Sequence, residues 1–346
     1  MRELLRAASV MGIGQLSQLH QAHRVAWRSI LSGYYTARTI EALFNVGFLD
    51  EVQAAGSVNP QTFAKERGLD ASILQSLCDS LFALRVLRKQ DSGYALDRAG
   101  EVIVRTARGW FDISYGYEEV FHNLEALLKK EKHYGRDVHR RSVWVAAGSG
   151  EIERLIYFPL AIEIARARGA RNVLDLGCGD GTFLRDLCLK VPDVVGYGLD
   201  LAPDAIEDGR VKAEAAGLGR RIHLRAEDIC NIAKLSEGWH EVDIAFTFFV
   251  LHELRYVGVE CVVEFLSAFR KLFPKVPLVV FEAIRPTLQE MRRRPGMSVH
   301  YFLYHDLTHQ KPVGRDEWRT LFGAAGFRTV EERWLGFVRT SIFTCA

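Results

Sequence analysis

A glycine-rich segment in the second half of the chain is the part of the sequence best suited to holding a ligand. Residues 173–182 read VLDLGCGDGT, so an apolar run with Asp175 near its end is followed by Gly177, Gly179 and Gly181. Glycines permit a tight turn and a close approach of ligand to backbone, where a Cβ would clash. The pattern predicts a strand, a binding turn and a helix that begins near Thr182.

Carboxylates end the next two apolar runs. Asp200 lies 19 residues after Gly181 at the end of VVGYGLD, and Glu227 and Asp228 end RIHLRAED. A carboxylate at the first position can accept both ribose hydroxyls of an adenosine ligand, and an acid at the second can take the adenine amino group. A dinucleotide fingerprint would need a third glycine where Thr182 stands, so the spacing disfavours a dinucleotide. The alternative to a ligand-binding turn is a plain strand-to-helix turn, and the acids that follow argue against it.

His252 follows a fourth apolar run, in the sequence FFVLHEL. Ligands of open α/β sheets bind beyond the carboxyl ends of the strands, which places this imidazole near the glycine turn. Histidine can act as a general base near neutral pH or bind a metal as neutral imidazole. A helix-capping or core histidine is the alternative.

Three more histidines, His300, His305 and His309, lie in SVHYFLYHDLTHQ. Their intervals of five and four also suit a solvated helix face. Together with His252, His305 could complete a two-histidine metal site with open positions for substrate and water. Glu253 is then a candidate third ligand or a partner of a ligand.

The segment from Asp175 to Gly181 resembles motif I of the class I S-adenosylmethionine (SAM) methyltransferases, D-x-G-x-G-x-G, and the resemblance covers roughly residues 150–346. It implies a Rossmann-like sheet with helices on both faces and SAM as cofactor. In small-molecule O-methyltransferases, a histidine at the position of His252 removes the substrate proton. The residues expected to bind the cofactor are Asp175, Gly177, Cys178, Gly179, Asp200, Leu201, Glu227, Asp228, Ile229 and Phe248.

Shorter motifs resemble one group within that family, the α-keto acid C-methyltransferases of the phenylpyruvate and 2-ketoarginine type. They are Tyr134-Gly135-Arg136-Asp137, Leu251-His252-Glu253 and His305-Asp306-Leu307-Thr308. This resemblance implies that His252 and His305 hold a mononuclear metal, iron or zinc, and that Arg136 grips the substrate carboxylate. For Arg136, a surface arginine in a charged stretch is the alternative.

Three functions follow from these patterns. The first is C-methylation of the β-carbon of a small 2-oxo acid through a metal-stabilised enolate. The second is O-methylation of a small molecule with His252 as general base, and the third is a SAM-binding winged-helix regulator. Acids such as Glu118 and Glu119 would suit a guanidinium side chain on the substrate, whereas the aromatic stretch around Trp110 would suit a ring.

The elements that position these residues change character along the chain. Short apolar runs after residue 170 alternate with helix-length stretches, which predicts a parallel sheet covered on both faces, and the stretch from Phe327 predicts a closing hairpin. The first half is helical: a helix that ends at Gly47, helices from Pro60 and over 71–85, and a hairpin turning at 91–93 have winged-helix order. Another helix is expected over 118–132, and residues 135–154 are expected to link two domains, 1–150 and 151–346.

Composition sets the remaining limits. A chain of 346 residues suits two domains. The net charge of 45 − 43 = +2, and a helix 71–85 with one acid and one base, argue against a nucleic-acid partner. The sequence shows no apolar run of about 20 residues and no secretory leader, so no membrane partner is expected. Six scattered cysteines without a CxxC pair favour a reduced cytoplasmic protein, and we expect a homodimer joined through residues 1–110.

Overall fold

The computed structural model describes residues 6, 9–234 and 241–346, which form two compact units, Met1–Tyr115 and Gly116–Ala346. The predicted boundary at 150/151 lies further along the chain than this division. Residues between the two positions pack with the second unit: Tyr117 stacks on Tyr304 at 4.8 Å, and Arg140 pairs with Glu253.

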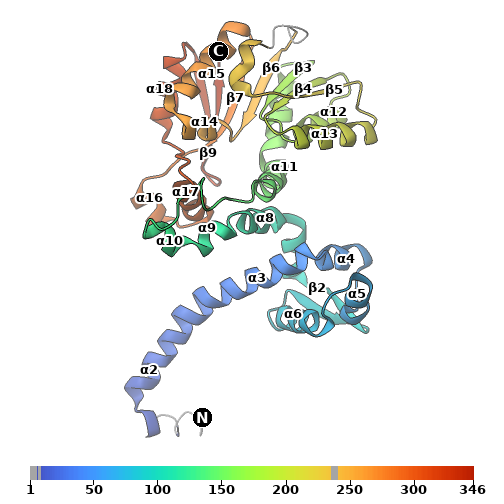
Figure 1. The fold of residues 1–346 in the computed structure, drawn as a ribbon, viewed down its shortest axis with the longest axis vertical. Helices are drawn as coiled ribbons and strands as arrows, with labels where there is room; N and C mark the ends of the chain where they lie inside the picture. Colours follow the sequence, from blue (N-terminus) through green and yellow to red (C-terminus); the bar gives the residue numbers. More distant parts are fainter. Residues whose placement is uncertain (1–5, 7–8, 235–240) are drawn as a thin grey trace. The chain divides into compact units, whose positions relative to one another are not determined.

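The first unit is mostly helical, as expected, with one small hairpin (Figure 1). Its elements are α2 (Ile13–Ala22), η1 (His23–Leu31), α3 (Ser32–Asn45), α4 (Phe48–Ala55), α5 (Pro60–Arg67), α6 (Ala71–Ala83), β1 (Leu87–Gln90), β2 (Gly93–Leu96), α7 (Arg98–Val102), η2 (Ile103–Ala107) and α8 (Arg108–Gly116), the last reaching the unit boundary.

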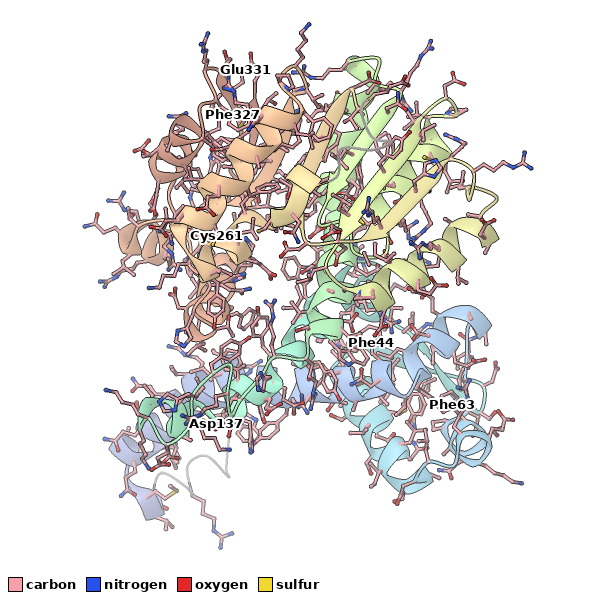
Figure 2. The ribbon with its side chains drawn as sticks, turned by 45° about the horizontal axis from the view of Figure 1, so that its top comes forward. Phe44, Phe63, Asp137, Cys261, Phe327 and Glu331 are labelled. Carbon is pink, nitrogen blue, oxygen red and sulfur yellow. The ribbon has the colours of Figure 1, made fainter. Side chains whose placement is uncertain are left out.

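Local signals fix the predicted helix–helix–hairpin order of this unit. The Asn59 side chain accepts hydrogen bonds from the first turn of α5, Pro60 occupies the first helical position, and Gly68 ends the helix in the left-handed region. Phe44 of α3 and Phe63 of α5 are buried in the core that these elements share (Figure 2). The elements predicted for this part of the chain are therefore present.

The second unit contains a seven-stranded sheet in the order β5-β4-β3-β6-β7-β9-β8. Five strands are parallel, and β9 runs antiparallel to both β7 and β8, which confirms the predicted closing hairpin. The strands are β3 (Asn172–Leu176), β4 (Val195–Asp200), β5 (Ile222–Ala226), β6 (Ile244–Phe248), β7 (Leu278–Ala283), β8 (Val330–Leu335) and β9 (Thr340–Cys345).

Helices cover both faces of this sheet. Val173 and Leu174 are consecutive in β3 yet lie in two different cores, because successive residues of a strand face opposite sides. Phe183 belongs to the first core and Phe265 to the second. The helices are α9 (Glu118–His122), α10 (Leu124–Leu128), α11 (Ser142–Ala167), α12 (Thr182–Lys190), α13 (Pro203–Ala215), η3 (Ile229–Lys234), α14 (Leu251–Val257), α15 (Val259–Leu272), α16 (Leu288–Arg293), α17 (Met297–Leu307) and α18 (Arg315–Ala324).

Two sequence expectations in this unit are wrong. The helix expected over 118–132 is two short helices, α9 and α10, separated at Asn123, whose side chain donates to the Glu119 carbonyl. The expected link over 135–154 is irregular only to Arg141, after which α11 begins. The glycines and serines of this segment suggested a linker, but the segment packs as a helix. Ile152 is buried, and Arg154 pairs with Asp186 of α12.

Across the described ranges, none of the helices combines the length and apolar character needed to cross a membrane.

Candidate active site

The turn after β3 has the backbone that its glycines predict. Gly177, Gly179 and Gly181 all have positive φ, at 82°, 53° and 71°. A Cβ added to Gly177 would lie 2.4 Å from a methyl carbon of Val250, which precedes α14. The loops after β3 and β6 therefore touch, at the point where the strand order reverses and open α/β sheets bind ligands.

The carboxylates after β4 and β5 lie beside this turn. Asp200 Oδ2 accepts from the Gly179 N–H at 2.8 Å, and the Glu227 N–H donates to the Asp200 carbonyl at 2.9 Å. Asp228 Oδ1 accepts from the N–H of Cys230 at the start of η3. The carboxyl ends of three neighbouring strands thus bring the predicted acids together.

The apolar residues of the predicted cofactor set lie in different surroundings. Cys178 and Ile229 are buried next to the acids, whereas Leu201 is 71% exposed. Phe248 is buried within an aromatic cluster and stacks on Phe281 at 4.8 Å. Leu201 is therefore the one of these four side chains that is open to solvent.

Asp175 is buried, and its Oδ1 has no hydrogen-bond partner among the residues that the structure describes. Burial, and then the nearby Asp200 carboxylate, raises the pKa of Asp175 well above its usual range. On α11, burial and the neighbouring Asp175 likewise raise the pKa of Glu153. An unpaired carboxylate oxygen with a second acid beside it suits a cationic ligand group. Sequence reasoning missed Glu153.

His252 is the second residue of α14, the helix after β6, and a buried carboxylate contacts it. Its Nδ1 lies 2.9 Å from Oε2 of Glu282 on β7, and its backbone N–H donates to Oε1 of the same side chain. Both side chains are buried. Burial acts to lower the pKa of His252, but the Glu282 carboxylate outweighs it and leaves that pKa raised. With Nδ1 directed at a carboxylate, Nε2 is the nitrogen available to a ligand.

His305, on α17, is the second histidine that the structure brings to this place. The His252 and His305 ring centroids are 4.9 Å apart. The His305 Nδ1 lies 2.6 Å from the Tyr301 carbonyl, which can only accept, so Nδ1 carries the proton. Burial, and then His252, holds the pKa of His305 well below its usual value, which keeps the ring neutral. His300 and His309, by contrast, are exposed.

Arg140, rather than Arg136, lies beside the histidines. The Arg140 guanidinium donates to Glu253 at 2.8 Å and to the Tyr117 hydroxyl at 3.3 Å. Its charge acts to lower the pKa of both histidines. The Arg136 side chain is 68% exposed and pairs with its neighbour Asp137. Asp137 lies on the loop between α10 and α11 (Figure 2).

Glu253, predicted as a possible third ligand, is already engaged. Its Oε1 accepts from Arg140 and from Gln310. In residues 6, 9–234 and 241–346, no group of three or more His, Cys, Asp or Glu side chains is arranged to hold a metal ion. The Nε2 atoms of His252 and His305 are therefore the protein atoms that could bind a metal ion here, and further ligands would come from substrate or water. Glu118, a candidate guanidinium partner, pairs with Arg141 at 3.0 Å.

Sequence reasoning missed Glu282 and Arg140. The signal for Glu282 was present, because a single glutamate interrupts the otherwise apolar strand LVVFEA. A charge in a buried strand is costly unless it is paired, so it marks a partner elsewhere. Nothing in the sequence distinguishes Arg140 from the other arginines nearby.

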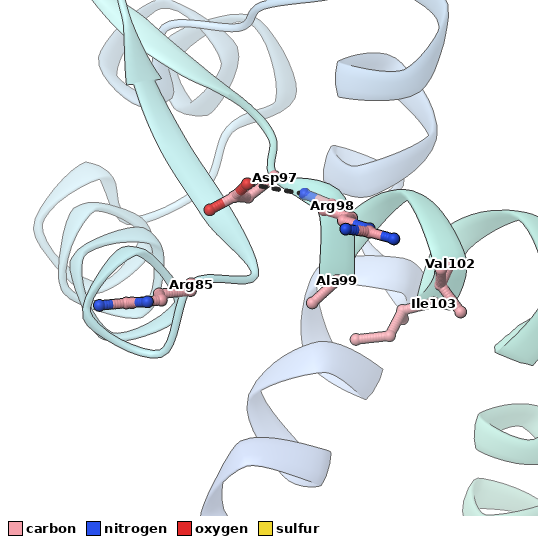
Figure 3. Close-up of a pocket in the computed structure, with 6 residues that line it drawn as sticks. All are labelled: Arg85, Asp97, Arg98, Ala99, Val102 and Ile103. Atoms are coloured by element: carbon pink, nitrogen blue, oxygen red, sulfur yellow. Dashed lines mark hydrogen bonds between the residues drawn. The ribbon is translucent and has the colours of Figure 1, made fainter.

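A hollow of about 630 Å³ lies in the first unit. It is lined by Arg85, Asp97, Arg98, Ala99, Val102 and Ile103. The two arginine side chains point in different directions, so they do not converge on one anion (Figure 3). The hollow therefore lacks converging charged groups, whereas the second unit brings two imidazoles together.

Comparison with known proteins identifies the family of the chain. Residues 115–332 match a family model described as a methyltransferase domain. The chain is 30% identical to a 2-ketoarginine methyltransferase from Streptomyces arginensis, over 87% of this chain and 88% of that protein.

Solved structures share the fold at low identity. The mitomycin 7-O-methyltransferase MmcR is similar with a TM-score of 0.68 and 17% identity, covering 95% of this chain and 99% of that one. The methyltransferase CalO1 of calicheamicin biosynthesis, solved with S-adenosylhomocysteine, is similar with a TM-score of 0.62 and 22% identity, covering 96% and 98%.

Proposed function

Because the chain belongs to the SAM-dependent methyltransferase family, we propose that it methylates the β-carbon of a small 2-oxo acid. The observation that supports this acceptor is the buried histidine pair, in which oxygens engage both Nδ1 atoms and both Nε2 atoms are left for a ligand. An oxygen partner on the second nitrogen is what orients metal-binding histidines in proteins. The relative named as a 2-ketoarginine methyltransferase points to the same acceptor class.

The cofactor would bind across the ends of β3, β4 and β5. We assign the ribose to Asp200, the adenine to Asp228, and the positively charged amino group of the methionine part to Asp175 and Glu153. The unpaired Oδ1 of Asp175 supports this assignment, since an ammonium group would supply its missing partner. The methyl group then lies toward the loop of Val250, two residues before His252.

The acceptor would bind at the histidines. His252 and His305 would hold an iron or zinc ion, which when bound polarises the keto oxygen and acidifies the neighbouring carbon. We assign the substrate carboxylate to Arg140, which lies beside Glu253, in place of Arg136. Loss of the β-proton to solvent water would give a carbon nucleophile. The new C–CH₃ bond would form as the S–CH₃ bond breaks, and the electron pair of the S–CH₃ bond would leave on sulfur.

O-methylation is the second candidate, favoured by the fold likeness to a 7-O-methyltransferase and by the His252–Glu282 pair. In that reaction His252 Nε2 takes the hydroxyl proton, and Glu282 stabilises the imidazolium that forms. No metal is required.

A methylation screen with elemental analysis separates the two. The purified protein is incubated with trideuteromethyl-labelled SAM and either 2-oxo acids, with aromatic or guanidinium side chains, or phenols. We expect label on the β-carbon of a 2-oxo acid, about one metal ion per chain, and loss of turnover after chelation that the metal restores. Label on phenolic oxygen that survives chelation supports the second candidate.

We also propose that residues 1–110 form a winged-helix-like unit that joins two copies of the chain. The order α5, α6, β1, β2 supports the winged-helix description. The run α2, η1 and α3 exposes large apolar side chains, and none of α2 or η1 is buried. Exposed apolar area of this kind favours a protein partner, and we assign it to a second copy. The exposed side chains are Ile13, Leu19, Val25, Trp27, Ile30, Leu31, Tyr34 and Tyr35.

A further inference from the structure

Tyr301 lies one helical turn before His305 on α17, and the two are held together. The Tyr301 carbonyl oxygen accepts a hydrogen bond from His305 Nδ1, with the two atoms 2.6 Å apart, and the two ring centroids are 4.1 Å apart. The phenol ring therefore packs against the imidazole that faces His252.

The hydroxyl of Tyr301 is buried and has no hydrogen-bond partner within the described part of the chain. Buried tyrosine hydroxyls normally have one, because an unpaired buried donor lowers stability. Polar groups around it are paired: His252 with Glu282, and Glu253 with Arg140. The Tyr301 hydroxyl is thus unpaired, while these neighbouring side chains are paired with one another.

We propose that the Tyr301 hydroxyl donates a hydrogen bond to the acceptor oxygen that gains negative charge when the acceptor is deprotonated. For a 2-oxo acid this is the keto oxygen, which becomes the enolate oxygen. The inference rests on the proposed function, because it needs an acceptor at the histidine pair. Burial, and then the nearby Glu282 carboxylate, raises the pKa of Tyr301 well above its usual value, so the phenol stays protonated at neutral pH and can donate.

The function of such a donor is to stabilise the transition state. A donor fixed in a buried site and aimed at developing charge contributes more there than in water, because no solvent must reorganise. The bond strengthens as charge accumulates on the oxygen, so its loss should lower kcat more than it raises KM. A tyrosine that only fills space would show neither effect.

The test is Tyr301→Phe, which removes one oxygen and keeps the ring. We expect kcat to fall roughly 10- to 100-fold while KM changes less than about threefold. Affinity for S-adenosylhomocysteine should be unchanged, and the melting temperature should be equal or up to about 3 °C higher, since an unpaired buried hydroxyl is removed. Tyr256→Phe is the control, because the Tyr256 side chain is 50% exposed on α14; it should keep the wild-type kcat.

Suppose that the wild-type enzyme methylates a 2-oxo acid and that Tyr301→Phe does so with the same kcat. That result overturns the inference about Tyr301 and leaves the proposed function unchanged. Methylation of phenols alone overturns the proposed function, and the same variant is then assayed on the phenol, whose oxygen also gains charge. If the wild-type protein methylates neither class, both proposals are wrong. A large fall in melting temperature would assign Tyr301 to packing and overturn the inference as well.

Discussion

The imidazole of His252 and the carboxylate of Glu282 are in direct contact, with Nδ1 and Oε2 2.9 Å apart and both side chains buried. Glu282 comes from a central strand and His252 from the first turn of the helix after the neighbouring strand. The contact fixes Nδ1 as the nitrogen that faces the carboxylate and leaves Nε2 for a ligand. Either proposed reaction needs that nitrogen, so the pair should matter in both.

Replacement of Glu282 by glutamine should therefore show whether Glu282 acts by orienting the His252 ring or by its negative charge. The amide can still contact Nδ1, but it lacks the charge that raises the pKa of His252. We expect kcat/KM to fall about 10- to 100-fold, the usual loss when the partner of a ligating or basic histidine is changed. SAM affinity by calorimetry should stay within about threefold. Glu260→Gln, on the exposed part of α15, is the control, and an equal loss there would contradict the assignment.

Arg140 and Arg136 give a matched pair for carboxylate recognition. Lysine at 140 keeps the charge but loses the planar fork that binds a carboxylate through two hydrogen bonds. We expect Arg140→Lys to raise KM for the 2-oxo acid at least about tenfold, and Arg136→Lys to leave it within about twofold. Initial-rate kinetics at saturating SAM measure both. The opposite result would return the role to the exposed Arg136.

Cofactor binding should depend on pH through the acids near the glycine turn. Asp175 and Glu153 have raised pKa values, so as pH falls each takes up a proton earlier than an ordinary carboxyl group. A cationic amino group binds the ionised form, so SAM affinity should rise with pH through those raised values and level off above them. Calorimetry between pH 5.5 and 8.5 follows this change; a flat profile would exclude the assignment.

The same acids make a prediction about stability. Ionising a carboxyl group whose folded-state pKa is raised costs folding free energy, and that cost grows as pH rises from the unfolded pKa to the folded one. Asp175→Asn should therefore raise the melting temperature of the cofactor-free protein at pH 8 by roughly 2–4 °C, about 1 kcal/mol. It should also weaken SAM binding by at least about tenfold. Lower stability combined with unchanged SAM binding would make Asp175 structural.

Much of the second unit could be predicted because its signals are local. The glycines after Leu176, the acid at Asp200 and the apolar runs each depend on a few neighbouring residues, and all lie where strand and turn chemistry places them. The Glu282–His252 contact joins residues 30 positions apart and exists only because β6 and β7 are neighbours. The pairing of β6 with β7 is a property of the folded sheet and cannot be read from neighbouring residues in the sequence.

The choice between Arg136 and Arg140 shows the same limit more sharply. Both arginines lie in one charged stretch, four positions apart. The Arg136 guanidinium is exposed, whereas the Arg140 guanidinium contacts Glu253. The irregular loop before α11 has no periodicity that would orient them. Likewise, Gly148 and Gly150 suggested a linker, although α11 accommodates both because the apolar residues that follow pack on the sheet.

The exposed apolar run of the first unit leads to a prediction about assembly. Trp27 and Ile30 are 49% and 63% exposed on η1, and burying such side chains is worth about 1.5–3 kcal/mol each. If a second copy covers them, Trp27→Glu and Ile30→Glu together should turn a dimer into a monomer in light scattering at micromolar concentration. The paired control Lys65→Glu and Glu66→Lys changes exposed residues of α5 and should leave the dimer intact. A wild-type protein that is monomeric at these concentrations would contradict the proposed dimer. Folded monomeric variants with full activity would show that each subunit contains a complete active site.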